Sequence, residues 1–278
     1  MGIIYSLFKL KNSLPKEDIQ HNCIFTLTGH KKALVIGINY QNDDSNSNDL
    51  HGCTNDVVSL QSYLQKCCFF NEEDITLLCT ADTTTKNSIQ GQLRELVFYS
   101  YRYPNCELWL SFSGHGGGVY NNNENDQQSE VICPSDYKTK GAIIDTWLKN
   151  HFVNRLHPRT KLFILMDCCH SGTNVNLPYQ LIGNKESLLL NPNNSITATV
   201  IKLSGCQDQQ TSAEYYDQEA QEYKGALTTT FLKYAKEFHG TQFKTLRDNV
   251  RKGLDHRGFQ QKPMLSFSQI GHSNWYLF

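Results

Sequence analysis

The chain has 278 residues, and its 26 Lys and Arg against 27 Asp and Glu give a formal net charge of −1 at pH 7. A chain of this length buries about 75% of the surface that it exposes when unfolded, so a sizeable core needs no covalent staples. The near-neutral charge argues against nucleic-acid binding, which needs a basic stripe. A hydrophobic content of 39% indicates a globular protein rather than a disordered one.

The ten cysteines are the unusual part of the composition. No CxxC pair occurs, which excludes a zinc ribbon. Lys9 and Lys11 interrupt the apolar start, so we expect no signal peptide. No apolar run approaches the roughly 18 residues of a membrane-spanning helix. We therefore expect free thiols in a reducing, cytoplasmic compartment.

Residues 1–30 are interpreted as an N-terminal extension. The start, Met1-Gly2 with Ser6, fits the M-G-x-x-x-[ST] pattern of N-myristoylation, although a chance match explains it equally simply. A single myristoyl chain at Gly2 would give only marginal membrane association.

From residue 32 onward, short apolar runs alternate with segments of helical periodicity. Strands are predicted at 33–38, 75–78, 107–113, 161–166, 197–203 and 263–267. One helix is predicted to begin at Asn55 or Asp56, and a second to begin after Thr85, which caps it. Two more are predicted over 226–238 and 241–252. Polar or Pro- and Gly-containing stretches predict a linker within 177–195 and a long loop over 207–223. This alternation predicts a largely parallel sheet with helices on both faces.

Residues of chemical interest follow three of the predicted strands. His115 stands among glycines after one strand, Cys169 precedes His170 after another, and a segment with Cys53 and Asp56 follows the first. Ligands of an open parallel sheet bind beyond the carboxyl ends of its strands. A loop histidine beside turn glycines would explain His115 alone. A cysteine nucleophile with a histidine 169 − 115 = 54 residues upstream matches the separation of about 50 seen in caspases.

Alternation along a strand assigns different roles to the two adjacent thiols. Asp167 and Cys169 lie on one face, whereas Cys168 points into packing on the other. Ser113 and His115 also share a face, so one cleft would hold a thiol, an imidazole, a hydroxyl and a carboxylate. The simpler role for Asp167 is to cap the turn after its strand.

Several blocks, in the order of one known family, extend from about Lys32 to the C-terminus. They are 33–40 (ALVIGINY), 52–57 (GCTNDV), 113–117 (SGHGG), 167–172 (DCCHSG), 177–179 (LPY), 204–213 (SGCQDQQTSA) and 261–263 (QKP). In these blocks the sequence resembles the metacaspases, which are caspase-like cysteine peptidases. The resemblance implies a three-layer αβα sandwich with a largely parallel central sheet.

The same resemblance suggests how the chain is divided. A peptidase domain would cover 31–278, with a p20-like part at 31–180, a short linker at 181–196 and a p10-like part at 197–278. This is similar to a type I metacaspase without a long prodomain, and we expect a monomer. In the family an N-terminal segment can lie across the cleft, which is a role available to residues 1–30.

The resemblance also implies roles for individual residues. His115 and Cys169 match the catalytic dyad, and the amides of Gly116 and Cys169 would form the oxyanion hole. The walls of the S1 pocket would be Cys53, Asp56, Ser113 and Asp167. Two carboxylates favour Arg or Lys at P1. An Asp at P1 would carry a like-charge penalty of about 2–5 kcal/mol. The alternatives are a catalytically silent scaffold and an Asp-specific caspase.

The sequence departs from the family at its calcium site. The positions that carry aspartates in many metacaspases read Ser129, Asp145, Thr146 and Asn176, so only Asp145 keeps its charge. Calcium affinity follows the number of charged ligands. We therefore predict no required cofactor and little Ca²⁺ dependence. A shifted site using Asp126 and Glu130 is the alternative, and Asp145 also fits a helix N-terminus without metal.

Lys185 lies in the expected linker, where an Arg/Lys-specific peptidase could cut itself. An ordinary solvated lysine is the simpler interpretation.

Overall fold

An eight-stranded sheet forms the middle layer of the protein in a computed structural model that describes residues 22–41, 49–120, 128–168, 175–188, 196–205, 213–237 and 240–277. The strand order is β2 (Ile75–Leu78), β1 (Lys31–Gly37), β3 (Glu107–Ser113), β7 (Lys161–Asp167), β10 (Thr199–Ser204), β13 (Met264–Phe267), β8 (Tyr179–Ile182) and β9 (Lys185–Leu188). The first five strands run parallel, and the last three pair antiparallel.

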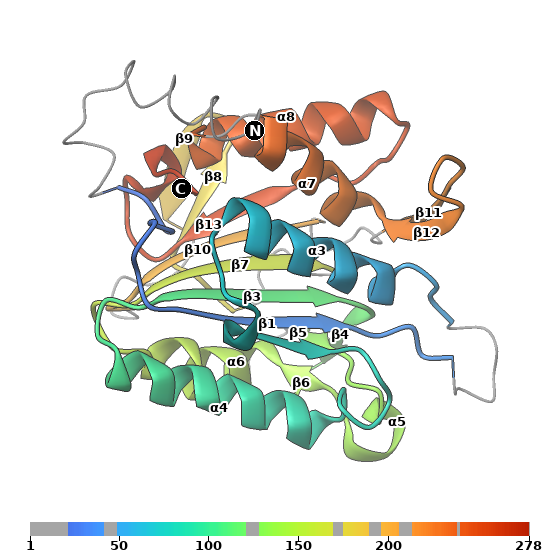
Figure 1. The fold of residues 1–278 in the computed structure, drawn as a ribbon, viewed down its shortest axis with the longest axis horizontal. Coiled ribbons are helices and arrows are strands. Elements are labelled where there is room, and N and C mark those ends of the chain that lie inside the picture. Colours follow the sequence, from blue (N-terminus) through green and yellow to red (C-terminus); the bar gives the residue numbers. More distant parts are fainter. Residues whose placement is uncertain are drawn as a thin grey trace.

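Helices cover both faces of this sheet (Figure 1). On one face lie α3 (Cys53–Cys67), α7 (Ala226–Glu237) and α8 (Phe243–His256), and on the other lie α4 (Lys86–Arg102) and α6 (Asp145–His151). The three-layer αβα architecture that the sequence predicted is confirmed.

Smaller elements surround the end of the sheet at which the parallel strands finish. A three-stranded sheet contains β4 (Gly116–Tyr120), β5 (Gln128–Ile132) and β6 (Ile143–Ile144), and α5 spans Tyr137–Lys140. A separate hairpin is formed by β11 (Glu214–Asp217) and β12 (Glu222–Gly225). Short 3-10 turns occupy Glu72–Asp74, Val153–Arg155 and His272–Asn274.

Local sequence explains the central elements. Every residue of β3 is buried, as expected of a strand covered on both faces. Helix α4 begins where the Thr85 hydroxyl accepts a hydrogen bond from Ser88 N at 3.3 Å, which confirms the predicted cap. Its buried residues Ile89, Leu93 and Leu96 recur at helical spacing and face the sheet.

The three central parallel strands have equal length and run in register. Their last residues, Gly37, Ser113 and Asp167, lie side by side, and so do their first residues, Lys31, Glu107 and Lys161. One edge of the sheet therefore carries the predicted site residues, and the opposite edge carries a row of charges.

Two stretches predicted to lack secondary structure are β hairpins. Residues 179–188 form β8 and β9, which extend the sheet through hydrogen bonding of β8 to β13, so the linker predicted over 181–196 begins within a strand pair. Lys185 is the exposed first residue of β9 rather than part of a structureless linker. The polar stretch 207–223 ends in the β11–β12 hairpin. Both predictions were wrong because each of these strands has only 4 residues, too few to show a clear apolar alternation.

Residues 22–30 pack against the edge opposite the predicted site. Backbone hydrogen bonds join Ile24 N to Tyr276 O and Phe25 N to Leu277 O, and both side chains are buried in the core. Glu107 N, at the start of β3, donates a hydrogen bond to His30 O. This part of the N-terminal segment therefore lies away from His115, and Gly2 lies outside the described residues.

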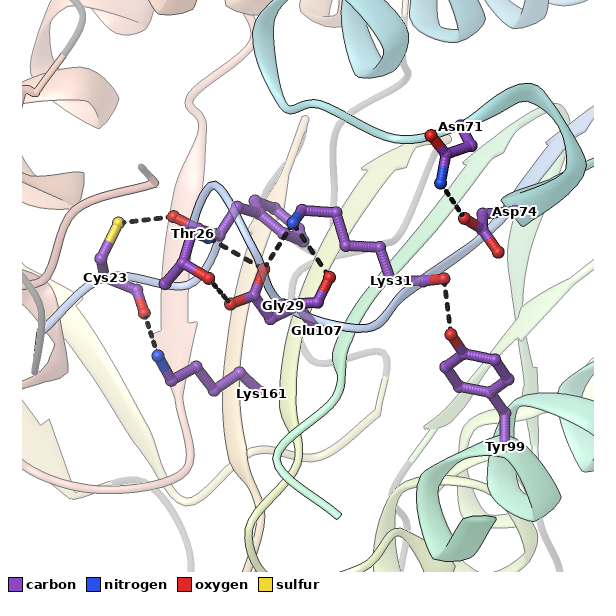
Figure 2. Close-up of polar contacts among 10 residues, drawn as sticks. Cys23, Thr26, Gly29, Lys31, Asn71, Asp74, Tyr99, Glu107 and Lys161 are labelled. Carbon is purple, nitrogen blue, oxygen red and sulfur yellow. Dashed lines mark hydrogen bonds and ion pairs between the residues drawn. The ribbon is translucent and has the colours of Figure 1, made fainter. Parts of the chain in front are cut away.

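A buried ion pair holds this segment in place (Figure 2). Lys31 Nζ lies 3.3 Å from Glu107 Oε2, and both side chains are 3% exposed. The Glu107 carboxylate also accepts hydrogen bonds from Thr26 N at 2.9 Å and Thr26 Oγ1 at 2.6 Å. Lys161 Nζ donates to Cys23 O at 2.6 Å. The row of charges at the strand starts thus anchors residues 22–30.

No disulfide joins the cysteines in the described part of the chain. Within the same residues, no helix is long and apolar enough to cross a bilayer.

Glu107→Gln is expected to destabilise the protein by about 3–5 kcal/mol, because it leaves the Lys31 ammonium buried without a counter-charge. The free energy of unfolding in urea measures this change. Asp255→Asn is the matched control, since Arg251 and Asp255 form an exposed pair at 3.9 Å. It should change stability by less than about 1 kcal/mol. Equal effects of the two substitutions would contradict a structural role for the buried pair.

Candidate active site

Two buried carboxylates from different elements meet beside the ends of the parallel strands. Asp56 lies in the first turn of α3, Asp167 ends β7, and they are 2% and 5% exposed. Asp56 Oδ1 accepts from Gly225 N at 3.1 Å, and Ser113 also hydrogen-bonds this carboxylate. Asp167 Oδ2 accepts from Thr228 N at 2.9 Å and Thr228 Oγ1 at 2.8 Å. The structure thus brings together three of the four predicted S1 residues.

The remaining oxygen of Asp56 faces the second carboxylate. Among the described residues, Asp56 Oδ2 has no hydrogen-bond partner. A Cβ placed on Gly225 would clash with Oδ2 of both Asp56 and Asp167, so the two oxygens lie close to each other against the Gly225 backbone. Glycine at 225 therefore allows the backbone to approach both carboxylates.

The electrostatics of the pair disfavour two charges. Burial, and then the neighbouring Asp167 carboxylate, raise the pKa of Asp56 well above its usual range. The hydrogen bonds from Gly225 and Ser113 act in the opposite direction and stabilise the ionised form. A cation beside the two carboxylates would offset the part of this pKa shift that comes from their repulsion.

Cys53 completes the predicted group of four pocket residues. It is the first residue of α3 and is 5% exposed. Burial and the carboxylates of Asp56, Glu214 and Asp167 raise the pKa of its thiol well above its usual range. Cys53 is therefore a neutral thiol, suited to a wall and not to a nucleophile.

His115 lies in the connection from β3 to β4, and backbone hydrogen bonds define its position. Cys133 N donates to His115 O at 3.0 Å, and His115 N donates to the Tyr40 hydroxyl at 3.0 Å. Gly114 N donates to Asp167 O at 3.3 Å, which joins this connection to the end of β7. Gly116 begins β4 and pairs with Ile132.

Cys169 lies outside the described residues, but its two predecessors show the expected alternation. Asp167 faces α7 through Thr228, whereas Cys168 is fully buried in the core on the α4 and α6 face. The prediction that Cys168 packs on the opposite side from Asp167 is confirmed.

The predicted calcium positions are only partly assembled. Asp145 Oδ1 accepts from Thr146 N and from Thr146 Oγ1, and Asp145 Oδ2 accepts from Asn176 Nδ2 at 2.9 Å. Ser129 is buried in β5, where it pairs with Val119. The described residues contain no cluster of three or more His, Cys, Asp or Glu able to hold a metal ion. Asp126 lies outside the described residues.

The C-terminal half of the chain contributes residues to the site that the sequence did not predict. The Glu214 carboxylate accepts hydrogen bonds from His51 N and from Gly52 N at 2.6 Å, at the N-terminus of α3. Asn55 Nδ2 donates to Tyr223 O at 2.9 Å. The β11–β12 hairpin thereby places Gly225 beside the carboxylates of Asp56 and Asp167. No local signal identified these residues, since each contact joins positions more than 160 residues apart.

Comparisons with known proteins identify the family of the chain. A family model described as metacaspase, peptidase C14 domain, matches residues 31–178. Metacaspase-1B of Aspergillus terreus is 31% identical over 87% of this chain and 76% of its own length. Metacaspase-1B of Aspergillus fumigatus is 30% identical over 87% of this chain and 70% of its own. A crystal structure of a Geobacter sulfurreducens protein matches with a TM-score of 0.61 and 18% identity, over 88% of this chain and 97% of that one.

The family match and the relatives place the chain among cysteine-type peptidases, and its fold is caspase-like. The chain belongs to the metacaspase family, as the sequence blocks predicted. The Geobacter structure supports the fold alone.

Gly225→Ala is expected to lower peptidase activity by at least about tenfold, because the added methyl would overlap Oδ2 of Asp56 and Asp167 and displace both carboxylates. Activity per folded molecule is the measurement. Gly91→Ala is the matched control, since nothing lies within 4 Å of a Cβ at this helical position. It should keep full activity and stabilise α4 by up to about 1 kcal/mol. Full activity of Gly225→Ala would show that the reaction does not depend on the placement of these two carboxylates.

Proposed function

We propose that this protein is a cysteine endopeptidase that cleaves after Arg or Lys and depends little on Ca²⁺. The observation that carries the proposal is the meeting of Asp56 and Asp167 at Gly225, where Asp56 Oδ2 has no hydrogen-bond partner among the described residues. A basic P1 side chain supplies both the missing partner and the missing counter-charge.

The charges of the pocket favour Arg over Lys and disfavour Asp. A guanidinium donates through a planar fork that suits carboxylate oxygens, whereas an ammonium acts as a point charge. An acidic P1 would add a third carboxylate to a pair whose repulsion already raises the pKa of Asp56. The penalty for such a like-charge contact is about 2–5 kcal/mol, which corresponds to roughly 30- to 4,000-fold.

The proposed reaction uses two side chains and two backbone amides. His115 accepts the proton of the Cys169 thiol, and the thiolate attacks the carbonyl carbon of the scissile bond. The amides of Gly116 and Cys169 stabilise the oxyanion, and protonated His115 returns its proton to the leaving amine. Water then attacks the resulting thioester, which releases the new carboxylate and regenerates the thiol.

The surroundings of Asp145 support weak calcium dependence. Ca²⁺ takes six to eight oxygen ligands, several of them carboxylates. Both Asp145 oxygens already accept hydrogen bonds, and Asn176 presents its Nδ2 donor to one of them. Burial lowers the pKa of Lys149, which lies one turn along α6, and the charge of Asp145 offsets only part of this lowering. These residues do not fit a calcium site.

Other expectations remain predictions: the division of the chain into domains, a monomeric state, a cytoplasmic location, myristoylation at Gly2 and self-cleavage after Lys185.

A set of fluorogenic peptides that differ only at P1 tests the specificity. Wild type is expected to cleave the Arg peptide fastest, the Lys peptide next, and the Asp peptide at least about 30-fold more slowly in kcat/KM. Cys169→Ala should abolish all cleavage, which separates the peptidase from a silent scaffold. Preference for the Asp peptide would refute the S1 assignment.

Asp56→Asn distinguishes loss of the pocket from loss of the fold. It should lower kcat/KM for the Arg peptide by about 30-fold or more. Its thermal midpoint at neutral pH should hold or rise, because the repulsion from Asp167 is removed.

Calcium titration after chelation tests the second part of the proposal. Wild-type kcat/KM should change by less than about tenfold up to roughly 1 mM Ca²⁺. Asn176→Asp is the matched variant, because it places a second carboxylate beside Asp145 and should increase the response to calcium. Strong activation of the wild type would point to ligands other than Asp145, Thr146, Ser129 and Asn176.

A further inference from the structure

Tyr40 occupies an unusual position beside His115. It follows β1 by three residues, is 8% exposed and has a φ of 58°. A bulky side chain with positive φ is uncommon, and such backbone conformations persist where the surrounding contacts hold them. The contacts of Tyr40 are therefore informative.

The Tyr40 hydroxyl closes a ring of three hydrogen bonds around the backbone of His115. His115 N donates to the Tyr40 hydroxyl at 3.0 Å, and this hydroxyl donates to Cys133 O at 2.5 Å. Cys133 N in turn donates to His115 O at 3.0 Å. Both backbone polar groups of His115 are thus held by a ring that one side-chain oxygen completes.

The aromatic ring of Tyr40 lies against the imidazole. The ring centroids of Tyr40 and His115 are 4.5 Å apart, with an angle of 33° between the planes. The Tyr40 ring also meets Tyr137 edge-on at 6.1 Å. The imidazole therefore lies against an aromatic ring that is itself packed against Tyr137.

We propose that Tyr40 is a positioning residue for His115: its hydroxyl holds the backbone at this residue, and its ring limits the orientation of the imidazole. The inference rests on the proposed catalytic role of His115 and extends it to a side chain that touches no reacting atom. Misplacement of a catalytic group by about 1 Å can cost 100-fold in rate, so rigid support matters.

Two further features agree with this role. Burial raises the pKa of Tyr40 well above its usual range, so the hydroxyl keeps the proton that it donates to Cys133. A Cβ on Gly114 would lie 2.9 Å from the Tyr40 oxygen and 2.9 Å from Phe112 Cζ. The residue before His115 thus has to be glycine while the Tyr40 hydroxyl lies there.

Tyr40→Phe tests the proposal, because it removes the hydrogen bonds and keeps the ring. We expect kcat per folded molecule to fall by about 10- to 100-fold and KM to stay within about threefold. The peptide used is whichever of the Arg, Lys and Asp peptides wild type cleaves fastest, and circular dichroism gives the folded fraction.

Tyr99→Phe is the matched control. The Tyr99 hydroxyl also donates to a backbone carbonyl, that of Lys31 at 2.9 Å, but at the opposite end of the sheet (Figure 2). This variant should lose stability without losing kcat. An unchanged kcat in Tyr40→Phe, or a loss explained entirely by unfolding or by KM, would overturn the positioning role.

Gly114→Ala provides a second variant if Tyr40→Phe does not fold. It displaces the Tyr40 hydroxyl without deleting it, and it should reproduce the fall in kcat at constant KM. When both variants fold, the double variant should be no slower than the slower single one, because both act through one contact. Full kcat in Gly114→Ala or additive losses in the double variant would reject the inference. A wild type that cleaves none of the peptides would instead reject the proposed function.

Discussion

The register of three parallel strands is the constraint on which the rest of the structure depends. Strands β1, β3 and β7 have equal length and start together, so they also finish together. Gly37, Ser113 and Asp167 therefore form one row, and the loops that follow them share one edge of the sheet. A slip of one residue in β7 would turn Asp167 to the opposite face and remove it from Asp56. The active site is thus a consequence of strand pairing.

The two ends of this sheet use charge in opposite ways. At the starting edge, Lys31 and Glu107 neutralise each other in a buried pair that anchors residues 22–30. At the finishing edge, Asp56 and Asp167 lie together, and their repulsion raises the pKa of Asp56. The neutralised pair thus holds residues 22–30, whereas the pair of carboxylates lies beside the candidate site, where the proposed basic P1 side chain would neutralise it. Such local conflict is expected at functional sites.

At the predicted calcium residues, a buried charge is again stabilised by its neighbours. Asp145 is the one charged residue left at those positions, and its oxygens accept hydrogen bonds from Thr146 and Asn176. Local donors thus stabilise the carboxylate in the way that a cation would. Around His115, the fold itself supplies the support through Tyr40, whose strained backbone is held by the hydrogen bonds that it makes.

The sequence by itself determined the family and the three-layer fold and named the candidate residues of the site, because strand ends and motif blocks are local patterns. The alternation that separates Asp167 from Cys168 was also readable, since it depends only on the period of a strand. Only the tertiary structure decided which distant groups reach the site: Gly225, Thr228 and the Tyr40 hydroxyl. Each of these depends on a contact between segments far apart in the chain. Residue type sets what a side chain can do, whereas its partners depend on how the elements pack.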